Sequence, residues 1–393
     1  MIGTNHERDD GMVLPDEMVV DLGGQQTMSA PGMLATVLPG GEIDVDLDPG
    51  IEDQPVIDDG GHYENLAARL SETQLAKIAQ DVDEMVRADR EARAPWFKRL
   101  AKGMELLGLV GEIGVDPPFD GASTAVHPLI AEAVVQFQSR ALAELFPATG
   151  PAKGVVMGEI TKALEEQAKR VADYRNYQLT VIDKTYFPES DRLLWGVGYA
   201  GSMFRKAYRD PLLKQNVARL INAADFLVPY AATTLQDASR YTHVIPYSQY
   251  EMKQLQDSGF YDKTDLGIPS STRDADDSQD LRDAQDRAEG KAENDLREED
   301  REHVAYEMTV DYSVPGIDGG RVQPYVLSVE RDSLKTIAIR RGWKESDQDR
   351  RRRVQVVHYP FIRGDGFYGL GLLHMAAGLG RAGTGALRVI LDN

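Results

Sequence analysis

The sequence contains no cysteine, which excludes disulfide bonds, cysteine zinc sites and cysteine nucleophiles. A chain without cysteine suits a reducing compartment. No apolar run approaches the about 20 residues that a membrane-spanning helix needs. The first residues also lack the apolar core of a signal peptide. We therefore expect a protein that is made in a cytosol-like setting and has no membrane partner.

Basic residues are scarce relative to acidic ones. The chain has 44 Lys and Arg against 64 Asp and Glu, a formal net charge of -20. Residues 1–60 carry a net charge of -13 and residues 271–302 carry -7, so the remainder of the chain sums to zero. A dense basic surface, typical of proteins that bind nucleic acid tightly, is therefore not expected.

Residues 1–60 mix acids with glycine and proline and show no hydrophobic periodicity. Such a composition cannot bury enough apolar surface to offset chain entropy, so it predicts a disordered acidic tail. A D-x-D-x-D run at residues 44–48 mimics the start of a calcium loop. Pro49 and Pro55 stand where an EF-hand needs Gly and Glu, so we expect no calcium site.

Apolar residues at three- and four-residue steps predict helices. The predicted helices cover residues 64–108, 128–146, 161–187 and 247–258. Pro95 predicts a break in the first of them, and Pro188 predicts the end of the third. Residues 367–393 predict a further, glycine-rich helix with an apolar pattern.

Three regions predict β-structure. Residues 199–230 are expected to form two strands around a turn at Asp210-Pro211. Apolar and polar residues alternate over 304–312, the pattern of a half-buried strand. Two further short strands are expected at 325–330 and 336–340. The result is an α+β fold, mainly helical, with a small three-stranded sheet inserted between helical regions.

The most tempting motif runs from Gly364 to Gly369, GDGFYG, and spells G-x-G-x-x-G between an apolar strand candidate and a helix. A dinucleotide-binding fingerprint has this order, but it also needs a second parallel strand that ends in an acid. The alternative is a tight turn followed by a closely packed helix. A second match at residues 378–383 lies inside the predicted helix, so the pattern arises easily in this stretch.

Other catalytic motifs are missing. The chain has no H-E-x-x-H, no G-x-S-x-G and no phosphate loop, and its seven histidines are scattered. We therefore predict no catalytic residues, no metal ligands and no cofactor. The four arginines at residues 350–353 predict a solvated face or an acidic partner, with phosphate binding as the alternative.

Several stretches, taken together in their order, resemble the portal proteins of tailed bacteriophages, in the branch of the short-tailed phages. They cover most of residues 75–393. The stretches are WFKRLAKGMELLGL (from Trp96), FDGASTAVHPLIAEAVVQFQSRALAELFPATGP (119–151), NYQLT (176–180), ESDRLLWGVGYAGSMFRKAYRDP (189–211), DFLVPYAATTLQDASRYTH (225–243) and HYPFIRGDGFYGLGLLHMAAGLGRAGTGALRVILDN (358–393).

The resemblance implies a structural subunit and no enzyme. Portal proteins form homo-oligomeric rings, usually dodecamers, at one vertex of the virion capsid, and they assemble in the host cytoplasm. Double-stranded DNA passes non-specifically through the channel during packaging and ejection. The implied partners are the terminase large subunit, capsid and scaffolding proteins, and tail adaptor proteins.

The family layout also implies a domain organisation. We expect an acidic disordered tail (1–60), a helical wing with a β-hairpin (61–245), a first stem helix with a charged insertion (246–303), a β-rich clip-like domain (304–360) and a glycine turn with a second stem helix (361–393). The channel loop, the second wing half and the crown of the family are expected to be missing. Arg381 and Arg388 lie seven residues apart on the proposed stem helix. They are expected to share a face that contacts the channel or a neighbouring subunit.

Two hypotheses of other classes stay open at this point. The first is a nucleotide-binding enzyme that uses the GDGFYG turn. The second is an acidic scaffold or adaptor module that acts through its disordered segments. Nucleotide-dependent thermal stabilisation distinguishes the first, and loss of partner binding on deletion of residues 1–60 distinguishes the second.

Overall fold

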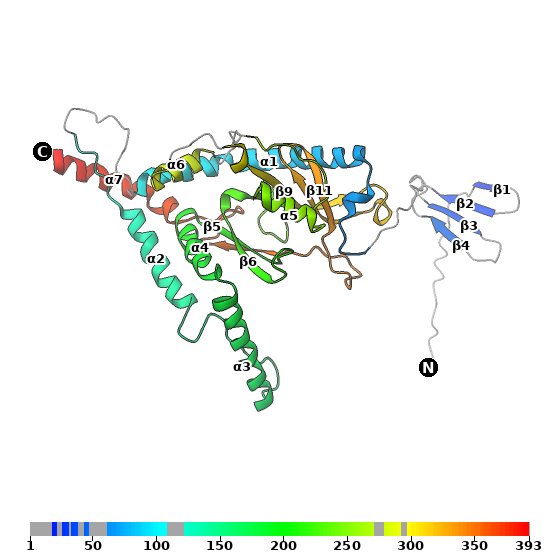
Figure 1. Ribbon diagram of the computed structural model, residues 1–393, viewed down its shortest axis with the longest axis horizontal. Coiled ribbons are helices and arrows are strands. Elements are labelled where there is room, and N and C mark those ends of the chain that lie inside the picture. The colour runs from blue at the N-terminus through cyan, green and yellow to red at the C-terminus, as the bar shows by residue number, and fades with distance from the viewer. Residues whose placement is uncertain are drawn as a thin grey trace, which may run out of the picture. The chain divides into compact units, whose positions relative to one another are not determined.

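The computed structural model divides the chain into two compact units, which are described separately (Figure 1). One unit comprises residues 1–58 with 314–320, and the other comprises 59–313 with 321–393. The structure describes residues 61–107, 122–270, 279–291 and 297–392, together with four strands between residues 18 and 46.

The N-terminal unit contains a four-stranded antiparallel sheet. Its strands follow one another in chain order: β1 (Met18–Asp21), β2 (Gln26–Ala30), β3 (Met33–Val37) and β4 (Ile43–Asp46). These strands differ from the disordered tail that the composition predicts. Val, Ile and Thr in these strands favour extended backbone. The remainder of residues 1–60 lies outside the described residues.

The larger unit has seven helices within the residues that the structure describes. They are α1 (Glu72–Met104), α2 (Leu129–Leu145), α3 (Lys162–Tyr177), α4 (Tyr186–Ala200), α5 (Gln249–Asp257), α6 (Gln279–Glu289) and α7 (Leu372–Asp392). With the antiparallel sheets described next, they make the fold α+β, as the sequence predicts.

The main sheet has five antiparallel strands in the order β11-β10-β9-β8-β7. The strands are β7 (Phe226–Leu227), β8 (Arg240–Ser248), β9 (Glu302–Ser313), β10 (Val322–Glu330) and β11 (Lys335–Arg341). The three strands predicted after residue 303 are present. However, β8 pairs with β9 from Arg240 to Ser248, so the sheet crosses the boundary that the sequence predicts between residues 303 and 304.

A second sheet has three antiparallel strands in the order β12-β5-β6. The strands β5 (Ser202–Arg209) and β6 (Asn216–Ile221) form the predicted hairpin, and β12 (Val356–Pro360) joins β5 from the far end of the chain. Asp210 fixes the hairpin turn because its Oδ1 accepts hydrogen bonds from the backbone N–H groups of Leu212 and Leu213.

Strand β9 is buried on both faces, although its alternating sequence predicts one solvent-exposed face. Ala305 and Thr309, expected on the exposed side, are 0% and 4% exposed. Helix α1 covers one face, where the guanidinium of Arg90 lies over the ring of Tyr306. Strand β5 covers the other face, where Lys206 forms an ion pair with Glu307.

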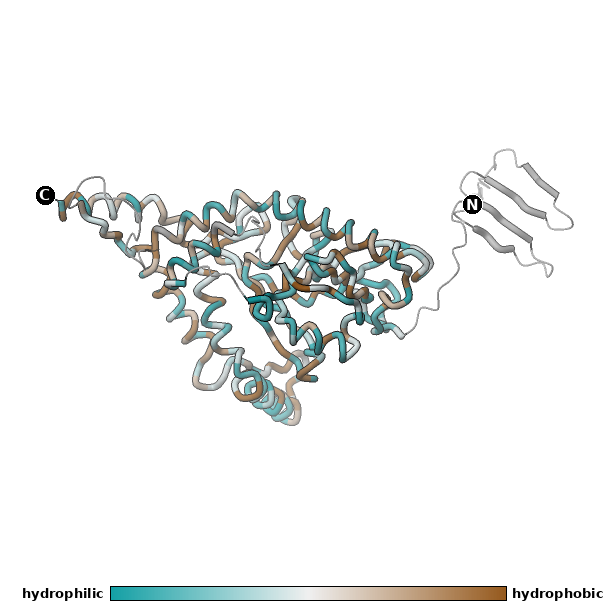
Figure 2. Tube along the Cα trace, turned by 45° about the horizontal axis from the view of Figure 1, so that its top comes forward, coloured by the Kyte–Doolittle hydropathy of each residue, from teal (hydrophilic) through white to brown (hydrophobic). Residues whose placement is uncertain are grey.

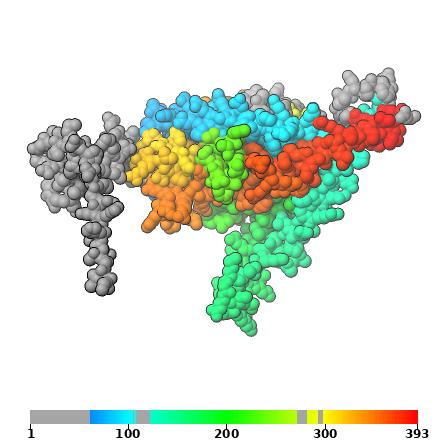
Figure 3. Space-filling model, turned by 180° about the vertical axis from the view of Figure 1, so that it is seen from behind, coloured from blue at the N-terminus to red at the C-terminus, as the bar shows by residue number. Residues whose placement is uncertain are grey.

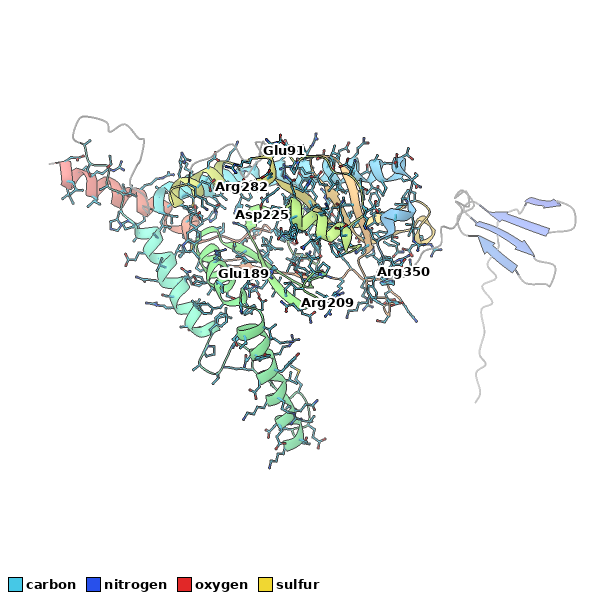
Figure 4. All side chains as sticks on the ribbon, in the orientation of Figure 1. Glu91, Glu189, Arg209, Asp225, Arg282 and Arg350 are labelled. Carbon is cyan, nitrogen blue, oxygen red and sulfur yellow. The ribbon has the colours of Figure 1, made fainter. Side chains whose placement is uncertain are left out.

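Pro95 does not break α1, contrary to the prediction. The helix runs through it from Glu72 to Met104 and mixes hydrophilic and hydrophobic residues along its length (Figure 2). Pro95 has no N–H to donate to the carbonyl of Glu91, one turn earlier (labelled in Figure 4). Trp96 and Phe97 offset this cost because both lie in the core, and the Trp96 ring stacks on Tyr368 at 4.6 Å.

Pro188 does not end a helix either. Helix α3 ends at Tyr177, a single π-helical turn follows at Gln178–Ile182, and α4 begins at Tyr186. Pro188 therefore lies in the first turn of α4, where the missing N–H costs no intrahelical hydrogen bond. The apolar residues predicted to line one side of a single helix over 161–187 are thus divided between two helices.

The largest hydrophobic cluster lies where α1, α2, α4, α7 and the three-stranded sheet meet. An aromatic stack forms its centre. The Phe204 ring stacks on Phe226 at 4.3 Å and on His358 at 4.6 Å, and His358 stacks on Phe367 at 4.8 Å. Residues from three distant parts of the chain are thus joined in one core.

A polar network lies between the five-stranded and the three-stranded sheet. Besides the Lys206–Glu307 ion pair, the hydroxyls of Tyr247 and Tyr261 lie 3.2 Å apart. Burial alone would raise the pKa of Glu307. The attraction of nearby positive charges, Lys206 first among them, has the larger effect, so the pKa of Glu307 is lowered. Burial, with a smaller contribution from Lys206, lowers the pKa of His243 to about 3.

Because of the lowered pKa of His243, we expect the free energy of unfolding to fall in mild acid. Because its pKa is lowered from 6.5 to about 3 in the folded chain, the unfolded chain binds the proton first as the pH falls. Stability should therefore decrease between pH 6 and pH 4 by about 1 kcal/mol per pH unit. Chemical denaturation across this range should show the slope, and His243→Gln should reduce it. An unchanged slope in the variant would contradict the assignment to His243.

Candidate functional site

Backbone amides of the GDGFYG turn and its continuation form hydrogen bonds within the chain. The N–H of Gly369 donates to Ser202 Oγ at 2.7 Å, and that of Leu370 donates to the carbonyl of Ile362 at 2.9 Å. The N–H of Gly371 donates to Nδ1 of His374 at 3.0 Å. A phosphate-binding turn needs such N–H groups free to point at the ligand.

Two glycines of this segment allow the backbone to approach the end of α4. A Cβ atom on Gly369 would lie 2.3 Å from the carbonyl oxygen of Gly201, and one on Gly371 would lie 2.3 Å from that of Tyr199. No real Cβ atom approaches backbone this closely. Gly366, in contrast, has no atom within 4 Å of its Cβ position. The spacing thus provides close packing, the alternative that the sequence left open.

The strand before the turn also differs from a dinucleotide-binding unit. Strand β12 lies at the edge of its sheet and pairs antiparallel with β5, whereas the fingerprint requires a strand–turn–helix unit in a parallel sheet. The second match at residues 378–383 lies inside α7, as predicted. The described residues therefore do not place GDGFYG in the context that the nucleotide hypothesis needs.

Ser202 and His358 form a pair that sequence spacing could not indicate. Ser202 Oγ and His358 Nε2 lie 3.0 Å apart, and burial, with the charge of Arg363, lowers the pKa of His358 to about 4. A serine nucleophile needs access to its substrate, but Ser202 is 0% exposed and also accepts the N–H of Gly369. The pair therefore joins β5, β12 and the glycine turn.

The predicted basic cluster at residues 350–353 is engaged with groups of its own chain. Arg352 forms an ion pair with Asp311, and Arg351 forms one with Asp349 at 2.5 Å. The Arg350 guanidinium lies 5.5 Å from the centre of the Trp343 ring. These contacts fit the acidic-partner hypothesis rather than phosphate binding.

Helix α7 has one apolar face that the described residues leave exposed. We call this face the α7 seam; it consists of Met375, Leu379, Ala382, Ala386 and Val389. These residues follow one another at steps of four, three, four and three, the spacing of a coiled-coil core. Leu379 is 66% exposed and Val389 61%. An exposed apolar stripe of this kind is typical of an interaction surface.

The opposite side of α7 is anchored to the body. Leu373 lies in the main core, where its side chain occupies the space above Gly103 of α1. Gly380 lies against Ile130 of α2, and the N–H of His127 donates to Thr384 Oγ1 at 3.1 Å. The anchoring leaves the seam facing away from these contacts.

Arg381 and Arg388, the predicted contact residues, lie beside the seam on the same flank of α7. Nε of Arg388 donates to the carbonyl of Ala125 at 2.9 Å, so this arginine binds the chain's own segment before α2. Arg381 lines a cavity between α7 and α1. Neither residue belongs to the seam itself. The seam was not predicted from the sequence, although apolar residues recur there at alternating steps of four and three.

Helix α3 forms an arm that extends away from the rest of its unit (Figure 1). None of its residues is buried. Val171 and Tyr174 are 54% and 62% exposed, and Met157 in the preceding segment is 94% exposed. The arm therefore exposes apolar side chains at a second place, apart from the α7 seam.

A cavity of about 640 Å³ lies between α1, α4 and α6. Its wall includes Trp195 and Tyr199, whose rings stack at 5.1 Å. Asp225 also lines it and pairs with Arg282 of α6 at 3.3 Å (Figure 4). The mixed aromatic and charged lining shows no arrangement typical of one reaction class.

The described part of the chain holds neither a cluster of metal ligands nor a membrane-spanning helix. There, no three His, Asp or Glu side chains lie close enough together to hold a metal ion. Within the same residues, no helix has the length and apolar character required to cross a bilayer.

Compared with models of known protein families and with curated protein sequences, the chain matches none.

Proposed function

We propose that this protein is a structural subunit of a bacteriophage portal ring. The ordered stretches that resemble short-tailed-phage portals support the proposal, and the α+β fold with a long, partly uncovered helix α7 is compatible with it. In this proposal the subunits form the channel through which the genome is packaged and ejected, and they perform no covalent chemistry.

The observation that carries the proposal is the α7 seam. Burying an exposed Met, Leu or Val side chain contributes on the order of 1.5–3 kcal/mol. A partner helix with the same four-three spacing can cover the seam by knobs-into-holes packing, and the alanines allow a close approach. A second copy of the chain supplies such a helix, and a ring closes when the contact is head-to-tail, with the seam of each subunit on a different face of its neighbour.

The proposal also assigns partners and location. The ring lies at the portal vertex of the virion after assembly in the host cytoplasm, and it is usually dodecameric in the family. The terminase large subunit, capsid and scaffolding proteins, and tail adaptors dock on it. The exposed apolar residues of the α3 arm offer one surface for such contacts.

Electron microscopy of the purified full-length chain tests the proposal. We expect rings with a central channel. Leu379→Glu should raise the concentration at which they dissociate by at least about tenfold, because a charge in a desolvated seam removes one central apolar contact. The matched control is Ile268→Glu, since Ile268 is 64% exposed but lies outside α7.

Monomers at all concentrations would contradict the ring, and equal weakening by both variants would contradict the seam. The acidic scaffold hypothesis makes a different prediction, because deletion of residues 1–60 should then abolish partner binding. The portal proposal expects rings to persist after that deletion.

A further inference from the structure

The cavity between α1 and α7 has a volume of about 400 Å³, and all the charged side chains in its lining are positive. The first turns of helix α7 lie against the C-terminal end of α1 here (Figure 3). Arg99 and Lys102 enter the lining from α1, and His374 and Arg381 enter it from α7. The other described residues in the lining are Gly103, Leu106, Leu370, Leu373 and Ala377. Among them there is no carboxylate.

None of the three cations has an ion-pair partner within the described part of the chain. Nε of Arg99 donates to the carbonyl of Pro95 at 3.3 Å, which leaves the two terminal nitrogens of its guanidinium for a ligand. Arg99 and Lys102 are exposed residues, as is Arg381. Three positive charges around one cavity repel one another, and an anion bound between them removes that repulsion.

His374 adds a neutral donor to this wall. Its Nδ1 accepts the N–H of Gly371, so the ring hydrogen lies on Nε2. Burial, followed by the charge of Arg99, lowers the pKa of this histidine, which keeps the ring neutral. Nε2 is buried and has no hydrogen-bond partner among the described residues. A buried donor without an acceptor is costly, and a bound oxyanion satisfies it.

We propose that this cavity binds a phosphate group through Arg99, Lys102, Arg381 and the Nε2–H of His374. Inorganic phosphate and phosphate monoesters carry up to two negative charges, and a phosphodiester carries one; the tetrahedral oxygens of each can meet donors that converge from two helices. A carboxylate has one charge and two oxygens in a plane. Arginine forks bind phosphate oxygens in pairs, and the leucines beside them suit the organic part of a phosphate ester.

Calorimetric titration of the full-length chain at low salt tests this site. The probes are inorganic phosphate and a short DNA duplex, which distinguish a free phosphate from a phosphodiester backbone. Acetate serves as the carboxylate control. We expect Lys102→Ala and Arg381→Ala each to weaken phosphate binding by about tenfold, the loss of one charge-assisted hydrogen bond.

Lys98→Ala is the matched control because Lys98 is an exposed lysine one helical turn before Lys102 and does not line the cavity. It should change affinity less than about twofold. Thermal melting of each variant checks that it is folded. Binding of neither phosphate probe, binding of acetate as tightly as phosphate, or equal losses in Lys98→Ala and Lys102→Ala would overturn the proposal. The site is independent of the ring proposal, since titration at concentrations below assembly reports on it alone.

Discussion

Replacing Gly369 by alanine should destabilise the larger unit by about 3 kcal/mol, lowering Tm by roughly 6–12 °C. The added Cβ would lie 2.3 Å from the carbonyl oxygen of Gly201 and 2.9 Å from that of Ile362. Both neighbours are backbone atoms, which cannot move aside as a flexible side chain can. The start of α7 would have to shift away from α4, and the hydrogen bond from Gly369 to Ser202 would lengthen. Thermal and urea denaturation measure the effect.

Gly366→Ala is the control, since its Cβ position has no neighbour within 4 Å. Both glycines belong to GDGFYG, so the two variants separate the packing interpretation from the nucleotide hypothesis. If the motif served a nucleotide, both substitutions should lower nucleotide binding and leave the free chain equally stable. Packing predicts a large difference in Tm without any ligand. Equal Tm values for the two variants would show that the backbone contact is not what requires glycine.

Lys206→Met should cost about 3 kcal/mol at pH 7. The substitution keeps the length of the side chain but leaves the Glu307 carboxylate, only 17% exposed, without its closest cation. The pKa of Glu307 is lowered in the folded chain, so its contribution is present above the unfolded pKa and is lost as pH falls through the folded value. The difference between wild type and variant should therefore shrink below about pH 4.

Two comparisons sharpen this result. The double variant Lys206→Met/Glu307→Gln should recover much of the lost stability, because no buried charge then remains unpaired. Lys263→Met removes a cation from an exposed pair with Asp257, 3.8 Å away, and should change stability by less than about 1 kcal/mol. A loss in Lys263→Met as large as that in Lys206→Met would mean that burial does not determine the cost.

Local patterns in the sequence predicted local structure well. The helix over residues 128–146 agrees with α2 to within one residue at each end, and the Asp210 turn joins two paired strands. Both depend on signals within a few residues, namely flanking prolines and turn chemistry. The break predicted at Pro95 and the helix end predicted at Pro188 were wrong, because a proline limits a helix only through its missing N–H and its ring. Core burial around Trp96 and the first-turn position of Pro188 outweighed that limit.

Long-range pairing was not predictable from the same patterns. The pairing of β8 with β9 joins residues separated by the acidic insertion, and no local signal specifies the partner of a strand. The contact of Arg381 and Arg388 with a channel or a neighbouring subunit stays a prediction. The spacing of Arg381 and Arg388 predicted a shared flank of α7, but Arg388 is engaged by Ala125 and the cavity around Arg381 depends on the distant residues Arg99 and Lys102.

The register of β8 and β9 has a consequence for how this chain can vary. Ser248 lies opposite Glu302, so the intervening residues 249–301 leave the sheet and return to it at neighbouring points. These residues form a long connection, or excursion, between two strands that pair with each other. Each doubling of the length of such a loop adds only about 0.6 kcal/mol to the entropic cost of closing it. The paired strands keep their alignment when exposed parts of this excursion change, whereas Met252, Leu255 and Leu281 within it lie in hydrophobic clusters and are not free to change. Its outer parts can therefore gain, lose or exchange acidic residues while the sheet that carries them stays in place.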